Sequence, residues 1–214
     1  MATIEPFRVM EIQALAHRLE AEGRRIIHME IGQPDFGAPQ QIVEAAISAM
    51  RKNLLGYTAA LGIPGLREAI AGHYLQRFGT EVAAEQIIVT PGASGAFLLV
   101  LAALVNSGDE ILMPDPCYPC NRHFVRLFDG KPVSIPVNAM QHYQPALSDI
   151  QSAWGPRTRG VLLASPSNPT GTIITRPELA QIAARVELQG GIVIVDSKTS
   201  DVDEEGDAHA RTLE

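Results

Sequence analysis

The segment after the apolar run at 87–90 has the composition of an anion-binding loop. Small residues, among them Ala93 and Ser94, stand just before a helical pattern. Such residues let backbone N–H groups approach a bound anion, and the positive end of the helix dipole favours that charge. The segment is not a Walker motif, because no Lys-Ser/Thr follows, and it is not G-x-G-x-x-G. A tight turn without a ligand is the alternative interpretation.

The second chemically promising segment is Pro114-Asp115-Pro116-Cys117-Tyr118-Pro119-Cys120, which follows another apolar run. Cys-x-x-Cys between a strand and a helix is typical of a thioredoxin-like redox site. The other interpretation makes Tyr118 the important residue, as an aromatic plate for a ligand, and the cysteines incidental. A zinc site is not expected, because the chain has no second pair of ligands.

Two further polar residues follow apolar runs. Asn168 stands in Ser165-Pro166-Ser167-Asn168-Pro169-Thr170-Gly171, whose prolines and glycine predict a stiff loop, and Asp196 directly follows the run at 191–195. A well-made turn and a helix cap are the structural alternatives. A carboxylate at the end of a buried strand is otherwise a candidate functional anion.

The elements that must position these residues alternate regularly. Apolar runs lie at 87–90, 110–113, 132–137, 160–164 and 191–195, and helical patterns lie near 94–106, 119–128, 146–154 and 176–189. Strands that are apolar throughout and separated by helices predict an α/β domain with a largely parallel sheet and helices on both faces. Ligands of such sheets bind beyond the carboxyl ends of the strands, which is where the four loops would lie.

The first part of the chain has a different pattern. Apolar residues recur at helical spacing from Val9 to Leu19, a short extended stretch follows at 26–31, and a turn follows at 32–36. A clear amphipathic helix is expected over 40–52. Pro64 fits the first turn of another helix that continues to about Phe78.

Composition narrows the class of protein. The chain has 214 residues, 46% of them apolar, and a formal charge of −7. The acidic balance argues against a nucleic-acid groove, which would need a basic stripe. The longest apolar run, Phe97 to Val105, is far shorter than the ~20 residues of a membrane span. No signal-peptide pattern is visible, and two cysteines do not make a disulfide framework, so we expect a cytoplasmic protein.

Taken together, the motifs resemble those of the class I and II, fold-type I aminotransferases that use pyridoxal 5′-phosphate (PLP). The matching segments are IGQPDF (31–36), GYTAALGIPGLREAIA (56–71), TPGASGA (90–96), DPCYP (115–119), SPSNPTG (165–171) and IVIVD (192–196). They occur in the family's order over residues 5–196, about nine-tenths of the chain. SNPTG with the upstream GYT segment is quite specific, whereas the other pieces are weak alone.

The resemblance implies a role in cofactor binding for several residues. Ala93 and Ser94 would hold the PLP phosphate, and Tyr118 would stack on the pyridine ring. Asn168 would donate a hydrogen bond to the phenolic oxygen of the ring. Asp196 would keep the pyridine nitrogen protonated, which makes the ring an electron sink.

Two residues of the N-terminal part also receive roles from the resemblance. Gly32 would lie beside the substrate carboxylate, as would Asn168. Tyr57 would reach the phosphate of a neighbouring subunit's cofactor, which implies a homodimer with its site at the subunit interface. The substrates would be an amino acid and a 2-oxo acid.

The chain also departs from the family pattern. Family members are about twice as long, and their later half carries the Schiff-base lysine and the arginine that binds the substrate carboxylate. Thr199 stands where the family usually has a tyrosine, and nothing matches Lys198 to the Schiff-base motif. Residues 197–214 have an acidic composition typical of disorder. A frame jump, a wrongly joined gene or an artificial boundary would explain this better than a natural tail.

These departures set the expected domain organisation. We expect an N-terminal arm and small-domain segment (1–55), an incomplete PLP-binding large domain (56–196) and an acidic tail, disordered or non-native (197–214). In the family's sheet the absent strands belong between 87–90 and 191–195, so both strands would have unpaired backbone groups, which favours self-association.

Three functions therefore remain as hypotheses. The first is an aminotransferase, represented by its amino-terminal half and inactive as this chain alone. The second is a catalytically dead fragment that binds PLP or dimerises. The third is a Cys-x-x-Cys redox protein. The identity of the amino donor cannot be predicted, because specificity comes largely from the absent half and the partner subunit.

Overall fold

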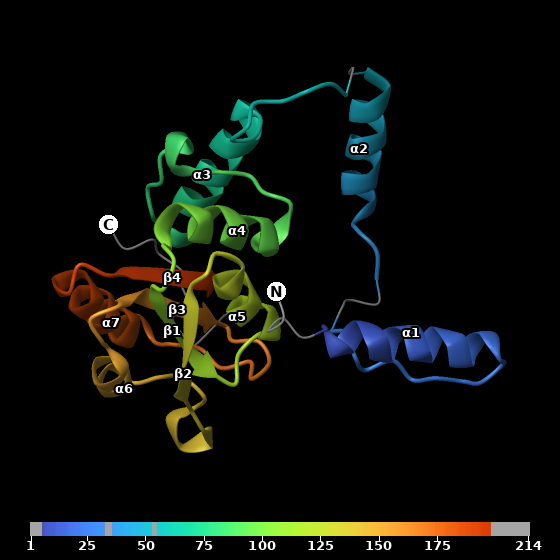
Figure 1. Cartoon of the computed structure of the whole chain (residues 1–214). Helices are drawn as coiled ribbons and strands as arrows, with labels where there is room; N and C mark the ends of the chain where they lie inside the picture. Colours follow the sequence, from blue (N-terminus) through green and yellow to red (C-terminus); the bar gives the residue numbers. More distant parts are fainter. Residues whose placement is uncertain (1–5, 33–35, 53–54, 198–214) are drawn as a thin grey trace. The chain divides into compact units, whose positions relative to one another are not determined.

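In the computed structural model, which describes residues 6–32, 36–52 and 55–197, four strands form one parallel sheet. They are β1 (Glu110–Asp115), β2 (Lys131–Pro136), β3 (Thr158–Ser165) and β4 (Ile192–Ser197). Their order across the sheet is β2-β1-β3-β4, and every neighbouring pair is parallel (Figure 1). Parallel neighbours need a long crossover, which the helices between the strands provide.

Helices cover both faces of this sheet. One face packs on α4 (Gly92–Leu104) and α5 (Pro119–Leu127), and the other packs on α6 (Leu147–Ala153) and α7 (Arg176–Leu188). The α4/α5 face encloses a core that includes Leu101, Val125, Ile111, Met113 and Leu162. The α6/α7 face encloses a core that includes Ile150, Ile182, Leu112, Val161 and Leu163. The α/β class predicted from alternating strands and helices is confirmed.

Burial differs sharply across the sheet. The central residues of β1 and β3 are buried on both faces, whereas all but the last residue of β4 are half-buried. Because β3 and β4 are in register, Val161 lies opposite Val193 and Ala164 lies opposite Asp196. Among the described strands β4 has one neighbour, so one edge of its backbone is unpaired.

The expectation of a strand at 87–90 was wrong. These residues follow a short 3-10 turn, Ala84–Gln86, and pair with none of the four strands. Arg67 donates hydrogen bonds from Nε to the carbonyl oxygens of Ala84 and Ile87, at 2.8 Å and 2.9 Å. An apolar, β-branched run becomes a strand only where a neighbour supplies ladder hydrogen bonds, and none of the described strands does so here.

A close contact fixes the start of β4. At Gly191 a side-chain carbon would lie 2.4 Å from Cη2 of Trp154, so the residue must be glycine for the indole to pack there. Trp154 directly follows α6, and its partly buried side chain packs against the α6/α7 core. The rigid indole therefore stands directly against the backbone from which β4 begins.

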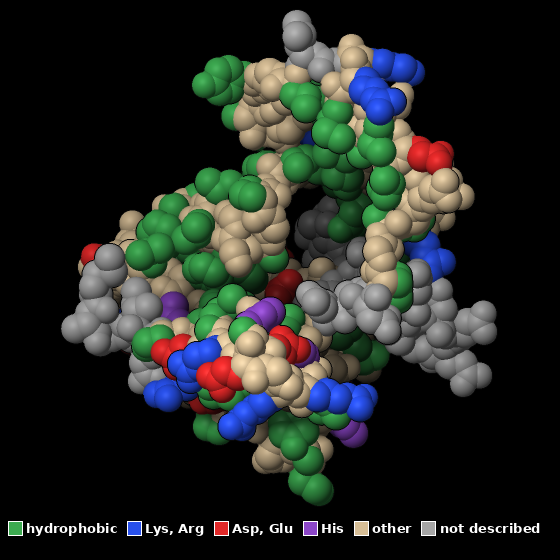
Figure 2. Space-filling view, turned by 90° about the vertical axis from the view of Figure 1, so that its right-hand side faces the viewer, with side chains coloured by type: hydrophobic (Ala, Val, Ile, Leu, Met, Phe, Trp, Pro, Cys, Tyr) green, Lys and Arg blue, Asp and Glu red, His purple; other side chains and the backbone are tan. Residues whose placement is uncertain are grey.

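The chain divides into two compact units between Ile63 and Pro64. The N-terminal unit contains α1 (Arg8–Ala21) and α2 (Gln40–Lys52), and its extended stretch at 26–31 forms no strand. Ala16 is the one buried hydrophobic residue described in these two helices. Many apolar side chains are instead at the surface (Figure 2), including Ile12 and Leu15 on α1 and Ile42 on α2.

The second unit begins with α3 (Pro64–Phe78), as predicted, and includes a 3-10 turn at Ala139–Gln141. None of the described helices has the length and apolarity needed to cross a membrane. Lys198, Thr199 and the acidic tail at 198–214 lie outside the described residues, as do residues 33–35 of the predicted turn. The compact units divide between residues 63 and 64. The domain boundary predicted between residues 55 and 56 is not tested by this division and stays a prediction.

Candidate cofactor site

Three of the predicted cofactor-binding residues follow or end strands at the carboxyl edge of the sheet. Tyr118 comes three residues after β1 and directly precedes α5. Asn168 comes three residues after β3, and Asp196 is the penultimate residue of β4. All three are half-buried. Parallel strands end at the same edge, so the topology places at one edge three residues that are far apart in the sequence.

The phenol of Tyr118 and the carboxylate of Asp196 interact electrostatically. The pKa of Tyr118 is raised from 10.0 to about 12, first by a hydrogen bond with the Cys120 side chain, then by burial, and then by the charges of Cys120 and Asp196. Each of these causes disfavours the phenolate. The Asp196 charge is the last of these causes, and it links the carboxylate to the tyrosine electrostatically.

The alternation of side chains along β4 shows which face Asp196 occupies. Ile194 packs against the core on the α4/α5 face, and residues two apart on a strand point the same way. Asp196 therefore points to the α4/α5 face. Tyr118 is the residue that directly precedes α5, the helix packed on that face. An aromatic ring and a carboxylate are thus presented on one face of the sheet at its carboxyl edge.

The loop that carries Asn168 is held closed by hydrogen bonds on both sides of that residue. The Ser167 N–H donates to the Thr172 carbonyl and the Gly171 N–H donates to the Ser167 carbonyl, each at 2.8 Å. Gly171 has φ +71°, a conformation that favours glycine. The Ile174 N–H donates to Ser165 Oγ at 3.0 Å. The expected stiff loop is therefore present.

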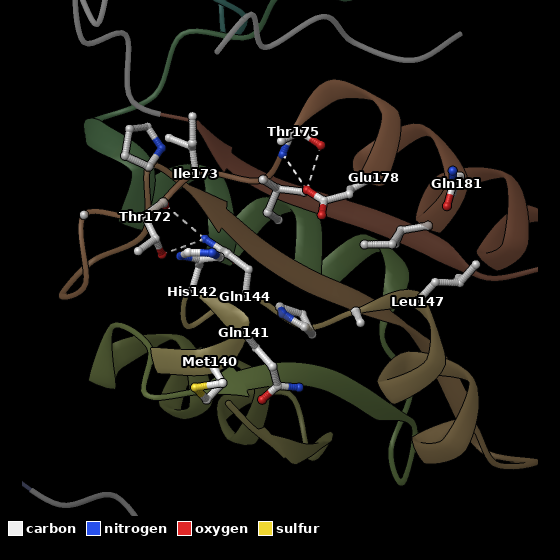
Figure 3. A pocket seen from close by; sticks show the side chains of 16 residues that line it. Met140, Gln141, His142, Gln144, Leu147, Thr172, Ile173, Thr175, Glu178 and Gln181 are labelled. Carbon is white, nitrogen blue, oxygen red and sulfur yellow. Dashed lines mark hydrogen bonds between the residues drawn. The ribbon is translucent and has the colours of Figure 1, made fainter. Parts of the chain in front are cut away.

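Sequence reasoning missed the residue that ties this loop to the sheet. Gln144 is buried, and its Nε2 donates to the carbonyl oxygens of Ala164 and Thr172 at 3.1 Å and 3.0 Å. Figure 3 shows its side chain directed at Thr172. A glutamine in an irregular segment matches no motif, so nothing in the sequence marked it.

Behind the loop lies a cavity of about 810 Å³ on the α6/α7 face. Its walls include Gln141, His142, Gln144, Thr172 and Glu178 (Figure 3). None of the residues predicted to bind cofactor or substrate lines it. Glu178 is already engaged, because it accepts hydrogen bonds from the backbone and the hydroxyl of Thr175 at the start of α7, and these lower its pKa. The cavity borders the Asn168 loop through Pro166 and Gly171.

Ala93 and Ser94 lie where the sequence predicted, in the first turn of α4, and both are exposed. The N–H groups of a helix's first turn have no acceptor within the helix and can bind an anion. No side chain makes a capping hydrogen bond at the start of this helix, where Pro91 is the N-cap residue. Gly92 has φ +77°, and no atom lies within 4 Å of the place that a Cβ would occupy there. One turn later Phe97 stacks on Phe124 of α5, with ring centroids 5.9 Å apart, which places α4 beside the helix that follows Tyr118.

Gly32 and Tyr57 belong to the N-terminal unit, and both are fully or largely exposed. Their roles at a substrate carboxylate and at a neighbouring subunit's cofactor remain predictions from the resemblance.

The two cysteines are free and do not have the character of a redox pair. Cys117 is buried, and burial raises the pKa of its thiol despite an Arg122 Nη2 contact at 3.6 Å from its Sγ. A reactive cysteine needs the opposite, a lowered pKa and exposure. The redox interpretation is therefore disfavoured. Within the described ranges no three His, Cys, Asp or Glu residues are grouped to hold a metal ion.

Comparison with known proteins decides the family. Residues 24–198 match the model of the aminotransferases of class I and II. The chain belongs to this family. Two curated relatives are a (5-formylfuran-3-yl)methyl phosphate transaminase of Methanocaldococcus jannaschii, 38% identical over 82% of this chain and 45% of the relative, and a valine–pyruvate aminotransferase of Mycobacterium tuberculosis, 39% identical over 86% and 47%.

Solved aminotransferase structures share the fold. An aminotransferase from Mycobacterium tuberculosis has a TM-score of 0.86 and 36% identity, covering 93% of this chain and 54% of that one. An aspartate aminotransferase from Thermus thermophilus with maleate has a TM-score of 0.87 and 28% identity, covering 92% and 51%. The chain therefore spans about half the length of the relatives it matches, and it corresponds to their amino-terminal half.

The residues at the carboxyl edge of the sheet fit PLP, the cofactor that the family's enzymes use. Tyr118 and Asp196 stand at the same edge of the sheet, and the Asp196 charge acts on the phenol. A pyridine ring stacked on the tyrosine, with its nitrogen hydrogen-bonded to the carboxylate, would need a ring and an acid so placed. The exposed first turn of α4 can take a phosphate. The fit extends to Asn168, whose loop is held at the same sheet edge.

Proposed function

We propose that the protein is a PLP-dependent aminotransferase that moves an amino group between an amino acid and a 2-oxo acid. The observation that carries the proposal is the position of Tyr118, Asn168 and Asp196 at the carboxyl edge of one parallel sheet. The contribution of the Asp196 charge to the raised pKa of the phenol supports it. This chain would supply the part of the enzyme that holds the ring and phosphate of the cofactor. In the proposal the enzyme is a cytoplasmic homodimer.

PLP, when bound, supplies an electron sink for the carbanion formed at the substrate α-carbon. The Asp196 carboxylate would hold a proton at the pyridine nitrogen, because a nearby negative charge stabilises the protonated ring. Tyr118 would stack on the ring, and the side-chain amide of Asn168 would donate a hydrogen bond to its phenolic oxygen. The N–H groups of Ala93 and Ser94 and the Ser94 hydroxyl would bind the phosphate.

The N-terminal unit would complete the site. Gly32 would leave room for the substrate carboxylate, together with Asn168, and Tyr57 would reach the phosphate bound by a second copy. The exposed phenol of Tyr57 supports a role outside its own unit, since it is not buried in any core of the described chain.

One observation favours a second candidate, a PLP-binding or dimerising protein without activity of its own. The described lysines are Lys52, in α2, and Lys131, which begins β2 at the amino edge of the sheet. Neither ends a strand at the carboxyl edge beside Asp196, and Lys198 lies outside the described residues. A Schiff-base lysine for this site is therefore not among the described residues of the chain.

Titration of the full chain with PLP and with pyridoxamine 5′-phosphate, followed by absorbance and fluorescence, tests the proposal. Asp196→Asn and Asn168→Ala should each weaken binding about tenfold or more, because hydrogen bonds to charged groups contribute roughly 1.5–3 kcal/mol. The matched control is Asp129→Asn, an exposed aspartate in the turn before β2, at the opposite edge. Binding that is absent, or equally weakened by the control, would contradict the proposal.

Borohydride reduction and mass spectrometry separate the two candidates. We expect no stoichiometric PLP adduct on any lysine of the chain. An adduct on Lys198 would show that this chain carries its own covalent anchor and would favour activity of the chain by itself.

A further inference from the structure

Asn121, on α5, is the polar side chain that the fold explains least. It is 1% exposed, and neither its Nδ2 nor its Oδ1 has a hydrogen-bond partner in the part of the chain that the structure describes. An amide enclosed in this way destabilises a fold, and an apolar residue of similar size would not. The sequence analysis assigned it no role, and the proposed cofactor contacts do not use it.

Its position on the helix shows what it faces. Asn121 lies one turn before Val125, so the two share a face of α5. Val125 is fully buried in the core between α5 and the sheet, with Met113 of β1 and Leu162 of β3. Because α5 starts at the carboxyl edge, Asn121 faces the sheet one turn closer to that edge than Val125 does.

Asp196 occupies the same face and the same edge. It follows Ile194, which packs against the core that contains Val125, by two residues on β4. Tyr118 connects the two positions. Its carbonyl accepts the Asn121 N–H at 3.1 Å, and the Asp196 charge contributes to its raised pKa. The enclosed amide and the carboxylate therefore share one face and one edge of the sheet with the tyrosine that would carry the cofactor ring.

We propose that Asn121 is a positioning residue for Asp196: when the cofactor is bound, its Nδ2 donates a hydrogen bond to the Asp196 carboxylate and directs the other oxygen at the pyridine nitrogen. This proposal rests on the proposed function. A donated N–H stabilises the ionised carboxylate, which must remain charged to keep the ring protonated. The buried amide is retained because it fixes the carboxylate, although it lowers the stability of the unloaded fold.

The test uses two substitutions of one shape in the full chain, Asn121→Thr and Asn121→Val. Threonine keeps a hydroxyl donor and valine does not. Pyridoxamine 5′-phosphate with a ¹⁵N-labelled ring nitrogen is the probe, and the readouts are its dissociation constant and the ¹⁵N signal that separates protonated from neutral ring. We expect Asn121→Val to bind at least about tenfold more weakly, with a smaller protonated fraction, and Asn121→Thr to fall between it and the wild type.

Two further measurements exclude a merely structural role. The melting temperature of Asn121→Val should equal or exceed that of the wild type, because two enclosed polar atoms are removed. The binding loss caused by Asn121→Val should disappear in an Asp196→Asn background, since coupled residues are non-additive. Val125→Ala, one turn further along the same face, should leave the ring signal unchanged.

Several results would overturn the inference. They are wild-type binding and ring signal in Asn121→Val, a binding loss that persists undiminished in the Asp196→Asn background, or an Asn121→Val chain that does not fold. These outcomes differ from failure of the proposed function itself, which would appear as wild-type binding that does not depend on Asp196.

Discussion

The two inner strands, β1 and β3, and the edge strand β4 all have apolar sequences but very different surroundings. β1 and β3 are apolar and buried on both faces between two neighbours. β4 is also apolar, with two isoleucines and two valines, yet all but its last residue are half-buried and one of its edges is unpaired within the described chain. Apolar sequence therefore predicts a strand of a parallel sheet, whereas its burial depends on what stands beside it.

The difference matters for the candidate site because its parts are divided between the two environments. Tyr118 and Asn168 follow the inner strands, and the Asn168 loop is further held by Gln144. Asp196 belongs to the edge strand. The aromatic ring and the amide are therefore presented by the better-packed part of the sheet, and the carboxylate by the less covered part.

The largest expected effect concerns the Schiff-base lysine. None of the described strands, inner or edge, has a lysine at its carboxyl end. We expect the 214-residue chain to transfer amino groups at least about 10²–10⁴-fold more slowly than its relatives, the range that a positioned general base typically contributes. A panel of amino acids and 2-oxo acids, with the valine–pyruvate aminotransferase of Mycobacterium tuberculosis as positive control, measures this. Turnover near the control's rate would show that a residue outside the described ranges supplies the base.

The comparison of strands is tested most directly by two valines that face each other. Val161 on β3 and Val193 on β4 are in register and belong to the same α6/α7 side. Val161→Ala should lower the free energy of unfolding by about 1.5–3 kcal/mol, because the side chain is fully buried. Val193→Ala should lower it by roughly half as much.

Urea unfolding of the two valine variants under identical conditions measures both values. Equal losses would mean that β4 is as well covered as β3 in solution, either by a partner strand or by self-association along its free edge. Sedimentation of the same samples distinguishes these causes.

A smaller effect tests the contact that joins the inner and edge strands at the site. The pKa of Tyr118 is raised from 10.0 to about 12. Between these values an unfolded chain loses the phenolic proton while the folded chain keeps it, so the contribution of Tyr118 to stability is present below pH 10 and is lost as the pH rises through about 12.

Absorbance at 295 nm, as the difference between wild type and Tyr118→Phe, isolates the ionisation of Tyr118. Cys120→Ala should lower its pKa more than Asp196→Asn does, because the hydrogen bond with Cys120 is the larger cause. An unchanged pKa in Asp196→Asn would separate β4 from the Tyr118 loop and remove the main support for the cofactor site.

The sequence predicted the parts of the fold that depend on local pattern. Helices 40–52 and 64–78 begin and end where the pattern placed them, and four of five apolar runs are strands. The run at 87–90 failed because strand formation depends on a neighbour, which no local pattern reveals. Tyr118, Asn168 and Asp196 could be placed at the carboxyl edge because each follows an apolar run, and their binding roles stay predictions. Asn121 and Gln144 could not, because their significance lies in burial and hydrogen bonding.

The packing of Trp154 on Gly191 has a spectroscopic consequence. Trp154 is the single tryptophan of the chain, and its indole rests on the residue that precedes β4. Tryptophan emission, excited selectively over the four tyrosines, therefore comes from one place, the point where β4 joins the α6/α7 core. Detachment of β4 would expose the indole to water and shift its emission to longer wavelength while the inner strands remained folded. Fluorescence would then follow the strand that carries Asp196, and far-ultraviolet circular dichroism would follow the rest.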